Sequence, residues 1–190
     1  MKLFFCTLLF VIYHTQITFA DENNKSKCPI FDPKIEKVYD AFKVNEFKKA
    51  YQILKPCNHP QSGGRFQWML GNLYVEGLGT EKSFKKGCDL FENCAKNGHS
   101  NCQLSLGICY ANGQGKIKDP VQAHMWFNIS ASQGYKESEK TAKNNLKLLE
   151  KNMSLKSKEE AYSKARKCID NVLIKLTNHW YGKKDQNYEC

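Results

Sequence analysis

The chain has 190 residues, nine of them cysteine, and 29 lysines and arginines against 19 aspartates and glutamates give it a net charge of +10. This length suits one domain with its own hydrophobic core. Most of the basic excess lies in residues 136–190, where lysines alternate with glutamates at helical spacing, so the charge indicates a solvated helix face and argues against a site for anionic polymers.

Residues 1–20 have the features of a signal peptide. An apolar run from Leu3 to Ile12 is followed by a small-residue cleavage site that ends at Ala20. The run is too short to cross a bilayer, and no second apolar stretch of about 20 residues follows it. We therefore expect a secreted or periplasmic protein with no transmembrane segment after cleavage near Ala20, and export argues against nucleic acid as a partner.

Residues 21–64 are expected to hold an irregular N-terminal arm and a helical hairpin. Apolar residues recur at helical spacing over residues 35–42 and again over residues 47–54. The second of these segments is similar to a later helix at an offset of 37 residues, which places Cys57 at the position of Cys94. The hairpin is therefore predicted to be a degenerate repeat that caps the start of the fold.

The region 65–135 contains an internal repeat with an offset of 36 residues. A period of this size is typical of a helical solenoid, in which each unit is a helix pair that buries its apolar face only by stacking on its neighbours. Helices are expected at about 66–76, 83–97, 102–111 and 120–133. The repeated identities are Leu70, Gly71, Tyr74, Gly77, Gly79, Phe91, Ala95 and Gly98, which recur as Leu106, Gly107, Tyr110, Gly113, Gly115, Phe127, Ala131 and Gly134.

Local signals predict the ends of these helices. Ser83 is a typical N-cap, and Asp119 is another, followed by proline at the first helical position. Gly98 ends the second helix of the first unit. Gly71 and Gly107 are expected to let paired helices approach closely, and the turn glycines supply backbone conformations that other residues enter at a cost.

The glycine turn is not repeated after residue 135. Apolar spacing predicts one helix at about 136–151 and another, capped by Ser154, at about 155–180. Residues 136–190 are therefore expected to cap the open C-terminal face of the solenoid.

The repeated segment resembles the Sel1-like repeats, a TPR-like family. The pattern Leu-Gly-x-x-Tyr-x-x-Gly-x-Gly occurs from Leu70 to Gly79 and from Leu106 to Gly115. The resemblance covers roughly residues 66–150. It implies an all-α fold, a right-handed α-solenoid of helix-turn-helix repeats with divergent N- and C-terminal capping helices.

Eight cysteines remain if Cys6 is removed with the signal peptide, and an even number in an exported chain predicts a disulfide framework. Facing residues of an antiparallel helix pair keep a nearly constant sum of residue numbers. Cys94 with Cys102, and Cys88 with Cys109, satisfy this condition as two rungs between adjacent repeats. Such bridges make the chain similar to the Helicobacter cysteine-rich group.

Elimination leaves Cys28 to pair with Cys57, and Cys168 with Cys190. Zinc is the alternative ligand for the four central cysteines. Their gaps of five, seven and six residues miss the usual two to four, so no metal site is expected.

The resemblance implies a protein–protein interaction or adaptor module that acts as a monomer without a cofactor. Its partner would be a protein or peptide, with a cell-envelope component among the candidates. Binding would use the concave face, which is lined by the first helix of each repeat. The candidate residues are Met69, Asn72, Glu76, Ser105, Ile108 and Asn112.

An enzyme related to β-lactamases or penicillin-binding proteins is the alternative, because the cysteine-rich relatives are associated with that chemistry. Ser83-Phe84-Lys85-Lys86 matches Ser-x-x-Lys by letter, but the Ser-Asp-Asn and Lys-Thr-Gly partners are absent. The histidines after the signal peptide form no helical pair suited to a metal. No catalytic residue is therefore assigned.

Overall fold

The computed structural model describes residues 34–59, 63–133 and 135–180, and of residues 34–35 and 172–180 only the backbone. The predicted signal peptide, the N-terminal arm, Cys28, Gly134 and Cys190 lie outside the described residues. The described part is all helical. Its elements are α2 (Lys34–Lys43), α3 (Phe47–Leu54), the 3-10 turn η1 (Lys55–Cys57), α4 (Gly64–Glu76), α5 (Phe84–Lys96), α6 (Ser100–Asn112), α7 (Pro120–Ser132), α8 (Lys136–Glu150) and α9 (Leu155–Trp180).

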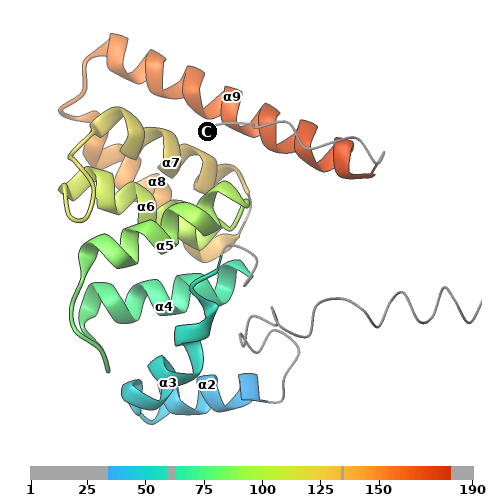
Figure 1. Cartoon of the computed structure of the whole chain (residues 1–190). Coiled ribbons are helices and arrows are strands. Elements are labelled where there is room, and N and C mark those ends of the chain that lie inside the picture. Colours follow the sequence, from blue (N-terminus) through green and yellow to red (C-terminus); the bar gives the residue numbers. More distant parts are fainter. Residues whose placement is uncertain (1–33, 60–62, 134, 181–190) are drawn as a thin grey trace, which may run out of the picture.

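The helices form one stack, with the α2–α3 hairpin at one end and α9 at the other (Figure 1). Each of α4 to α7 packs on the next helix in sequence, which confirms the expected all-α repeat fold. The long helix α9 differs from this order, because it packs on α7. The apolar core follows the stack as three clusters, one around the α2–α4 helices, one around α5 to α7, and one between α7 and α8. No described helix combines the length and the apolarity needed to span a bilayer.

The second helix of each repeat begins at the predicted cap. Ser83 Oγ accepts the Lys86 backbone N–H at 3.3 Å, and Asp119 Oδ1 accepts those of Val121 and Gln122 at 2.9 and 3.0 Å. These bonds satisfy N–H groups that have no partner within a helix. The first helices α4 and α6 start earlier than expected, at Gly64 and Ser100, without a side-chain cap.

The repeated glycines fit against aromatic rings of the paired helix. A Cβ added to Gly71 would lie 2.4 Å from the Phe91 ring, and one added to Gly107 would lie 2.5 Å from the Phe127 ring. No real Cβ contact is this short. The two repeats therefore share one packing contact, in which a ring of the second helix lies directly on the backbone of the first.

The turn glycines pack against the preceding repeat. A Cβ on Gly115 would lie 2.4 Å from the carbonyl oxygen of Phe84, at the start of α5, and a Cβ on Gly79 would lie 2.3 Å from that of Phe47, at the start of α3. Both glycines have positive φ, 74° and 69°. The start of α3 therefore contacts the turn at Gly79 in the same way as the start of α5 contacts the turn at Gly115, and the degenerate first repeat stays a prediction.

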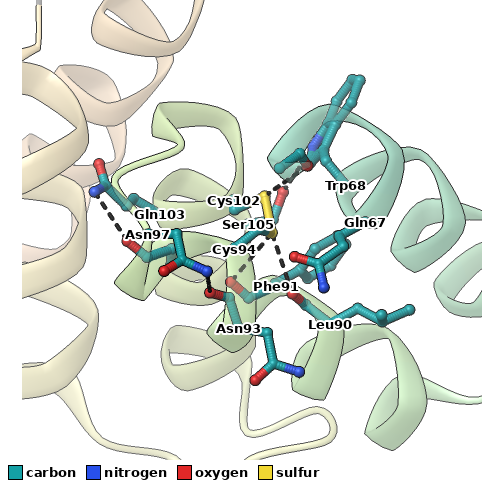
Figure 2. The surroundings of a disulfide bond; sticks show 12 residues. Gln67, Trp68, Leu90, Phe91, Asn93, Cys94, Asn97, Cys102, Gln103 and Ser105 are labelled. Carbon is teal, nitrogen blue, oxygen red and sulfur yellow. Dashed lines mark hydrogen bonds between the residues drawn. A yellow bond between two sulfur atoms is a disulfide. The ribbon is translucent and has the colours of Figure 1, made fainter. Parts of the chain in front are cut away.

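Two disulfides join α5 to α6. Cys88 is bonded to Cys109 and Cys94 to Cys102, with Cα–Cα distances of 6.2 and 5.8 Å. These are the pairs expected from the antiparallel register. Figure 2 shows the inner bridge in its packed surroundings.

Two further cysteines, Cys57 and Cys168, are also disulfide-bonded. Their predicted partners lie outside the described residues, so the pairings Cys28–Cys57 and Cys168–Cys190 stay predictions.

Serines replace the inner cysteine pair at the next junction, between α7 and α8. Ser130 and Ser138 stand 36 residues after Cys94 and Cys102. Ser130 Oγ donates to the Ser100 carbonyl at 3.0 Å, and Ser138 Oγ donates to Ser100 Oγ at 3.2 Å. All three serines are buried. The two serines at the α7–α8 junction therefore both bond to Ser100 of α6, whereas the cysteines at the α5–α6 junction bond to each other.

A buried histidine takes the position of the outer bridge. His124 stands 36 residues after Cys88 and is fully buried. Its Nε2 lies 2.7 Å from Glu150 Oε1, and the Tyr162 hydroxyl donates to the same oxygen at 3.3 Å. The imidazole also meets the Tyr162 ring edge to face, with centroids 4.8 Å apart. This cluster connects α7, α8 and α9.

The hydrogen bond with His124 is the main cause that lowers the pKa of Glu150. A carboxyl group with a lowered folded-state pKa adds stability above its unfolded pKa, and that stability disappears as the pH falls through the folded value. We expect Glu150→Gln to lower the free energy of unfolding by about 1 kcal/mol at pH 6, and by less below pH 4. Urea unfolding across this pH range measures the difference, with exposed Glu159→Gln as control. A pH-independent loss would contradict this account.

Candidate binding groove

The first helix of each repeat forms one series, α4, α6 and α8. The candidate positions on α4 recur on α6 at the repeat offset, with Asn72 matched by Ile108 and Glu76 by Asn112. The series continues on α8, where Leu148 follows Asn112 by 36 residues. Helix α8 therefore serves as a third first helix, although it has lost the glycine turn that follows the other two.

A cavity of about 140 Å³ lies between α4 and α6. Four of the six candidate residues line it: Asn72 and Glu76 from α4, and Ser105 and Ile108 from α6. The floor is aromatic and includes Phe91.

A larger cavity, of about 690 Å³, lies between α6 and α8. Ile108 and Asn112 line it from α6, and Asn145 and Leu148 line it from α8. Because Ile108 lines both cavities and is 39% exposed, the two form one continuous surface. We call this surface the helix-A groove; it is formed by Asn72, Glu76, Ser105, Ile108, Asn112, Thr141, Asn145 and Leu148.

Met69 is not part of the groove. It is only 7% exposed and belongs to the N-terminal core cluster with Leu70 and Leu73. The sequence spacing places Met69 on the same helical stripe as Asn72, but the α2–α3 hairpin contributes to the cluster that encloses it. Its role is therefore packing, which corrects the expectation of a surface contact.

The groove is rich in amides and has an apolar end. Asn72 donates from Nδ2 to the Trp68 carbonyl at 3.0 Å, which fixes the orientation of its amide. The larger cavity adds Phe127, Leu149 and Met153 to its lining. Such a surface can hydrogen-bond a polar chain and also accept an apolar side chain.

The Ser-x-x-Lys letters form a helix cap in the structure. Ser83 Oγ accepts a backbone N–H, and the side-chain Nζ of Lys86 lies 5.5 Å from the centre of the Tyr74 ring in a cation–π contact. Both groups therefore have structural partners. The described residues contain no group of three or more His, Cys, Asp or Glu arranged to hold a metal ion.

A pair of buried glutamines is absent from the sequence-based prediction. Gln67 Nε2 donates to the His59 carbonyl at 2.8 Å, and Gln103 Nε2 donates to the Ala95 carbonyl at 3.2 Å. Each bond reaches back eight residues, to the loop after η1 in the case of Gln67 and to the last turn of α5 in the case of Gln103. The sequence does contain a signal for this pair, because glutamine recurs at positions 67 and 103, which are separated by the repeat offset of 36 residues.

Known proteins similar to this chain are found among family models and among solved structures. The Sel1 repeat family matches residues 65–99 and 100–135. No curated protein sequence matches the chain.

Among solved structures, the fold is similar to a protective antigen of uropathogenic Escherichia coli strains that displays an SLR fold, with a TM-score of 0.65 and 22% identity over 83% of this chain and 33% of that one. It is also similar to a Sel1 repeat protein from Oxalobacter formigenes, with a TM-score of 0.50 and 23% identity over 78% of this chain and 61% of that one. The chain thus spans about a third and about three fifths of these structures, and at such identity the likeness concerns the fold.

Proposed function

Since residues 65–135 are two Sel1 repeats and repeats of this kind mediate protein–protein interaction, we propose that the chain is an exported adaptor that binds an extended segment of a partner protein along the helix-A groove. The observation that carries the proposal is the position of Ile108. It joins the two cavities into a surface that crosses three helices of the series.

The chemistry of the groove suits an extended peptide. Such a segment presents backbone N–H and C=O groups at regular intervals, and carboxamide side chains can both donate to and accept from them. Asn72, Asn112 and Asn145 stand on three successive helices of the series. The larger cavity, with Leu148 61% exposed at its rim, would bind an apolar anchor side chain.

The charges of the groove suggest in which orientation the partner segment lies along it. Among the described lining residues, Glu76 is the charged residue of the smaller cavity and Lys118 that of the larger one. A segment with a basic residue near Glu76 and an acidic one beyond its apolar anchor would match both. Like charges at these places would oppose binding.

Export is supported by the disulfides together with the N-terminal sequence. Bridges such as Cys88–Cys109 and Cys94–Cys102 persist in oxidising compartments. They are compatible with secretion or a periplasmic location after cleavage near Ala20. Determining the N-terminus of the protein recovered from its producing cells tests this directly, and a retained Met1 would contradict it.

The binding proposal is tested with a matched pair of isoleucines. A photo-crosslinking amino acid at position 108 is expected to capture a partner whose crosslinked segment can be identified and synthesised. Titration of this peptide should show at least tenfold weaker binding to Ile108→Lys than to the unmodified protein, because a long charged side chain there replaces the apolar contact that the two cavities share.

Ile117→Lys is the control, because Ile117 is 91% exposed and outside the groove. Its affinity for the peptide should stay within twofold of that of the unmodified protein. Equal losses in the two variants, or equal crosslinking from positions 108 and 117, would contradict binding in the groove.

A further inference from the structure

A third cavity, of about 560 Å³, lies at the opposite ends of α4 and α6 from the helix-A groove. It is lined by the first turns of both helices, whereas the groove uses positions 72–76 and 105–112. Its lining residues include Tyr39 of α2, Arg65 and Trp68 of α4, His99, and Tyr135 at the start of α8.

The charge of this cavity is positive. Arg65 is the charged side chain among the described lining residues, and no carboxylate is among them. Its Nη1 donates to the Tyr39 hydroxyl at 3.1 Å, which orients the guanidinium group and leaves further N–H donors on it. Burial, and then the charge of Arg65, lowers the pKa of His99, so this imidazole is neutral at pH 7.

Two of the aromatic lining residues, Trp68 and Tyr39, have their polar atoms engaged in hydrogen bonds. The indole Nε1 of Trp68 donates to Ser105 Oγ at 3.3 Å, a bond drawn in Figure 2. The Tyr39 hydroxyl is engaged by Arg65. Tyr135 is 65% exposed, so its ring is accessible from the cavity that it lines.

The cavity also contains polar groups without partners. The buried Nδ1 of His99 makes no hydrogen bond among the described residues. The helix that starts beside it, α6, has neither a side-chain cap nor an acidic residue in its first turn, whereas α5 and α7 are capped by Ser83 and Asp119. The guanidinium group of Arg65 and the uncapped start of α6 therefore lie at the same cavity.

We propose that this cavity binds a carboxylate carried on a six-membered ring, of the size of one acidic sugar unit. The carboxylate pairs with the guanidinium group of Arg65, whose fork geometry suits two oxygens. The ring lies against the faces of Trp68 and Tyr135. A volume of about 560 Å³ is within the range of small-molecule sites and accepts one such ring with its substituents.

The test uses methyl glucuronide as the probe, with methyl glucoside as its neutral counterpart and benzoate as a carboxylate on an aromatic ring. Binding is followed by the NMR shift of the Trp68 indole N–H. For a ligand of this size we expect a dissociation constant of about 1 mM for the glucuronide, and one at least tenfold higher for the glucoside. Tighter binding of benzoate than of the glucuronide would support a carboxylate site whose ligand has an aromatic ring. No shift of the Trp68 signal with either carboxylate would overturn the proposal.

The chain offers a matched control for the charge, because Arg166 is an exposed arginine on α9, outside the cavity. Arg65→Gln should raise the dissociation constant of the glucuronide about tenfold, and Arg166→Gln less than twofold. Arg65→Lys keeps the charge and should give an intermediate value. Equal effects of Arg65→Gln and Arg166→Gln would overturn the proposal, and thermal unfolding verifies that each variant is folded. The groove variant Ile108→Lys should bind the glucuronide normally, so the two sites are tested separately.

Discussion

Replacing Gly115 by alanine is expected to lower the free energy of unfolding by about 3 kcal/mol. The new Cβ would lie 2.4 Å from the Phe84 carbonyl oxygen and 2.9 Å from Cys88 Sγ. Both atoms are held firmly, one in the backbone at the start of α5 and the other in a disulfide. The φ angle of 74° adds the cost of a left-handed conformation for an L-residue.

Gly98→Ala separates these two costs. Gly98 also has a positive φ, 84°, but a Cβ there would meet nothing within 4 Å. We therefore expect a loss of about 1 kcal/mol, from backbone strain alone. Urea unfolding of both variants gives the comparison, and equal losses would show that the contact between the turn and the preceding repeat is unimportant.

Removal of the outer disulfide is expected to have a similarly large effect. The Cys88→Ala, Cys109→Ala double variant should lose about 3 kcal/mol, because the bridge closes a loop of 21 residues in the unfolded chain. The inner pair, Cys94 and Cys102, spans only eight residues and should contribute about 2.5 kcal/mol.

Chemical unfolding of both double variants under oxidising conditions measures these contributions. If the chain-entropy account holds, the outer bridge contributes more than the inner one. A larger loss on removing the inner bridge would instead point to packing of its buried sulfurs in the central cluster.

Much of the fold could be predicted because independent signals agree at the same positions. The repeat offset predicts which helices pair, Ser83 and Asp119 predict where the second helices begin, and Gly71 and Gly107 predict close contacts. Each of these signals is local or repeats exactly in sequence, so one chain is sufficient to detect it.

The remaining features depend on contacts between distant segments. Met69 lies on the predicted binding stripe, but its burial depends on where the α2–α3 hairpin packs. Helices α4 and α6 begin earlier than predicted, at Gly64 and Ser100, and neither start has a side-chain cap that the sequence could reveal. The extension of the groove onto α8 was missed because that helix has lost the glycine motif.

The exchange of cysteines for serines along the stack makes the two walls of the larger cavity chemically different. Its α6 wall is tied covalently to α5 by two disulfides. Among the described residues, its α8 wall is held by the hydrogen bond of Ser138 to Ser100 of α6, by the His124–Glu150 contact with α7, and by apolar packing around Phe127 and Ala142. A reducing environment would therefore loosen the α6 wall through its cysteines and leave these contacts of the α8 wall in place, so the redox state of the surroundings acts on one side of the cavity.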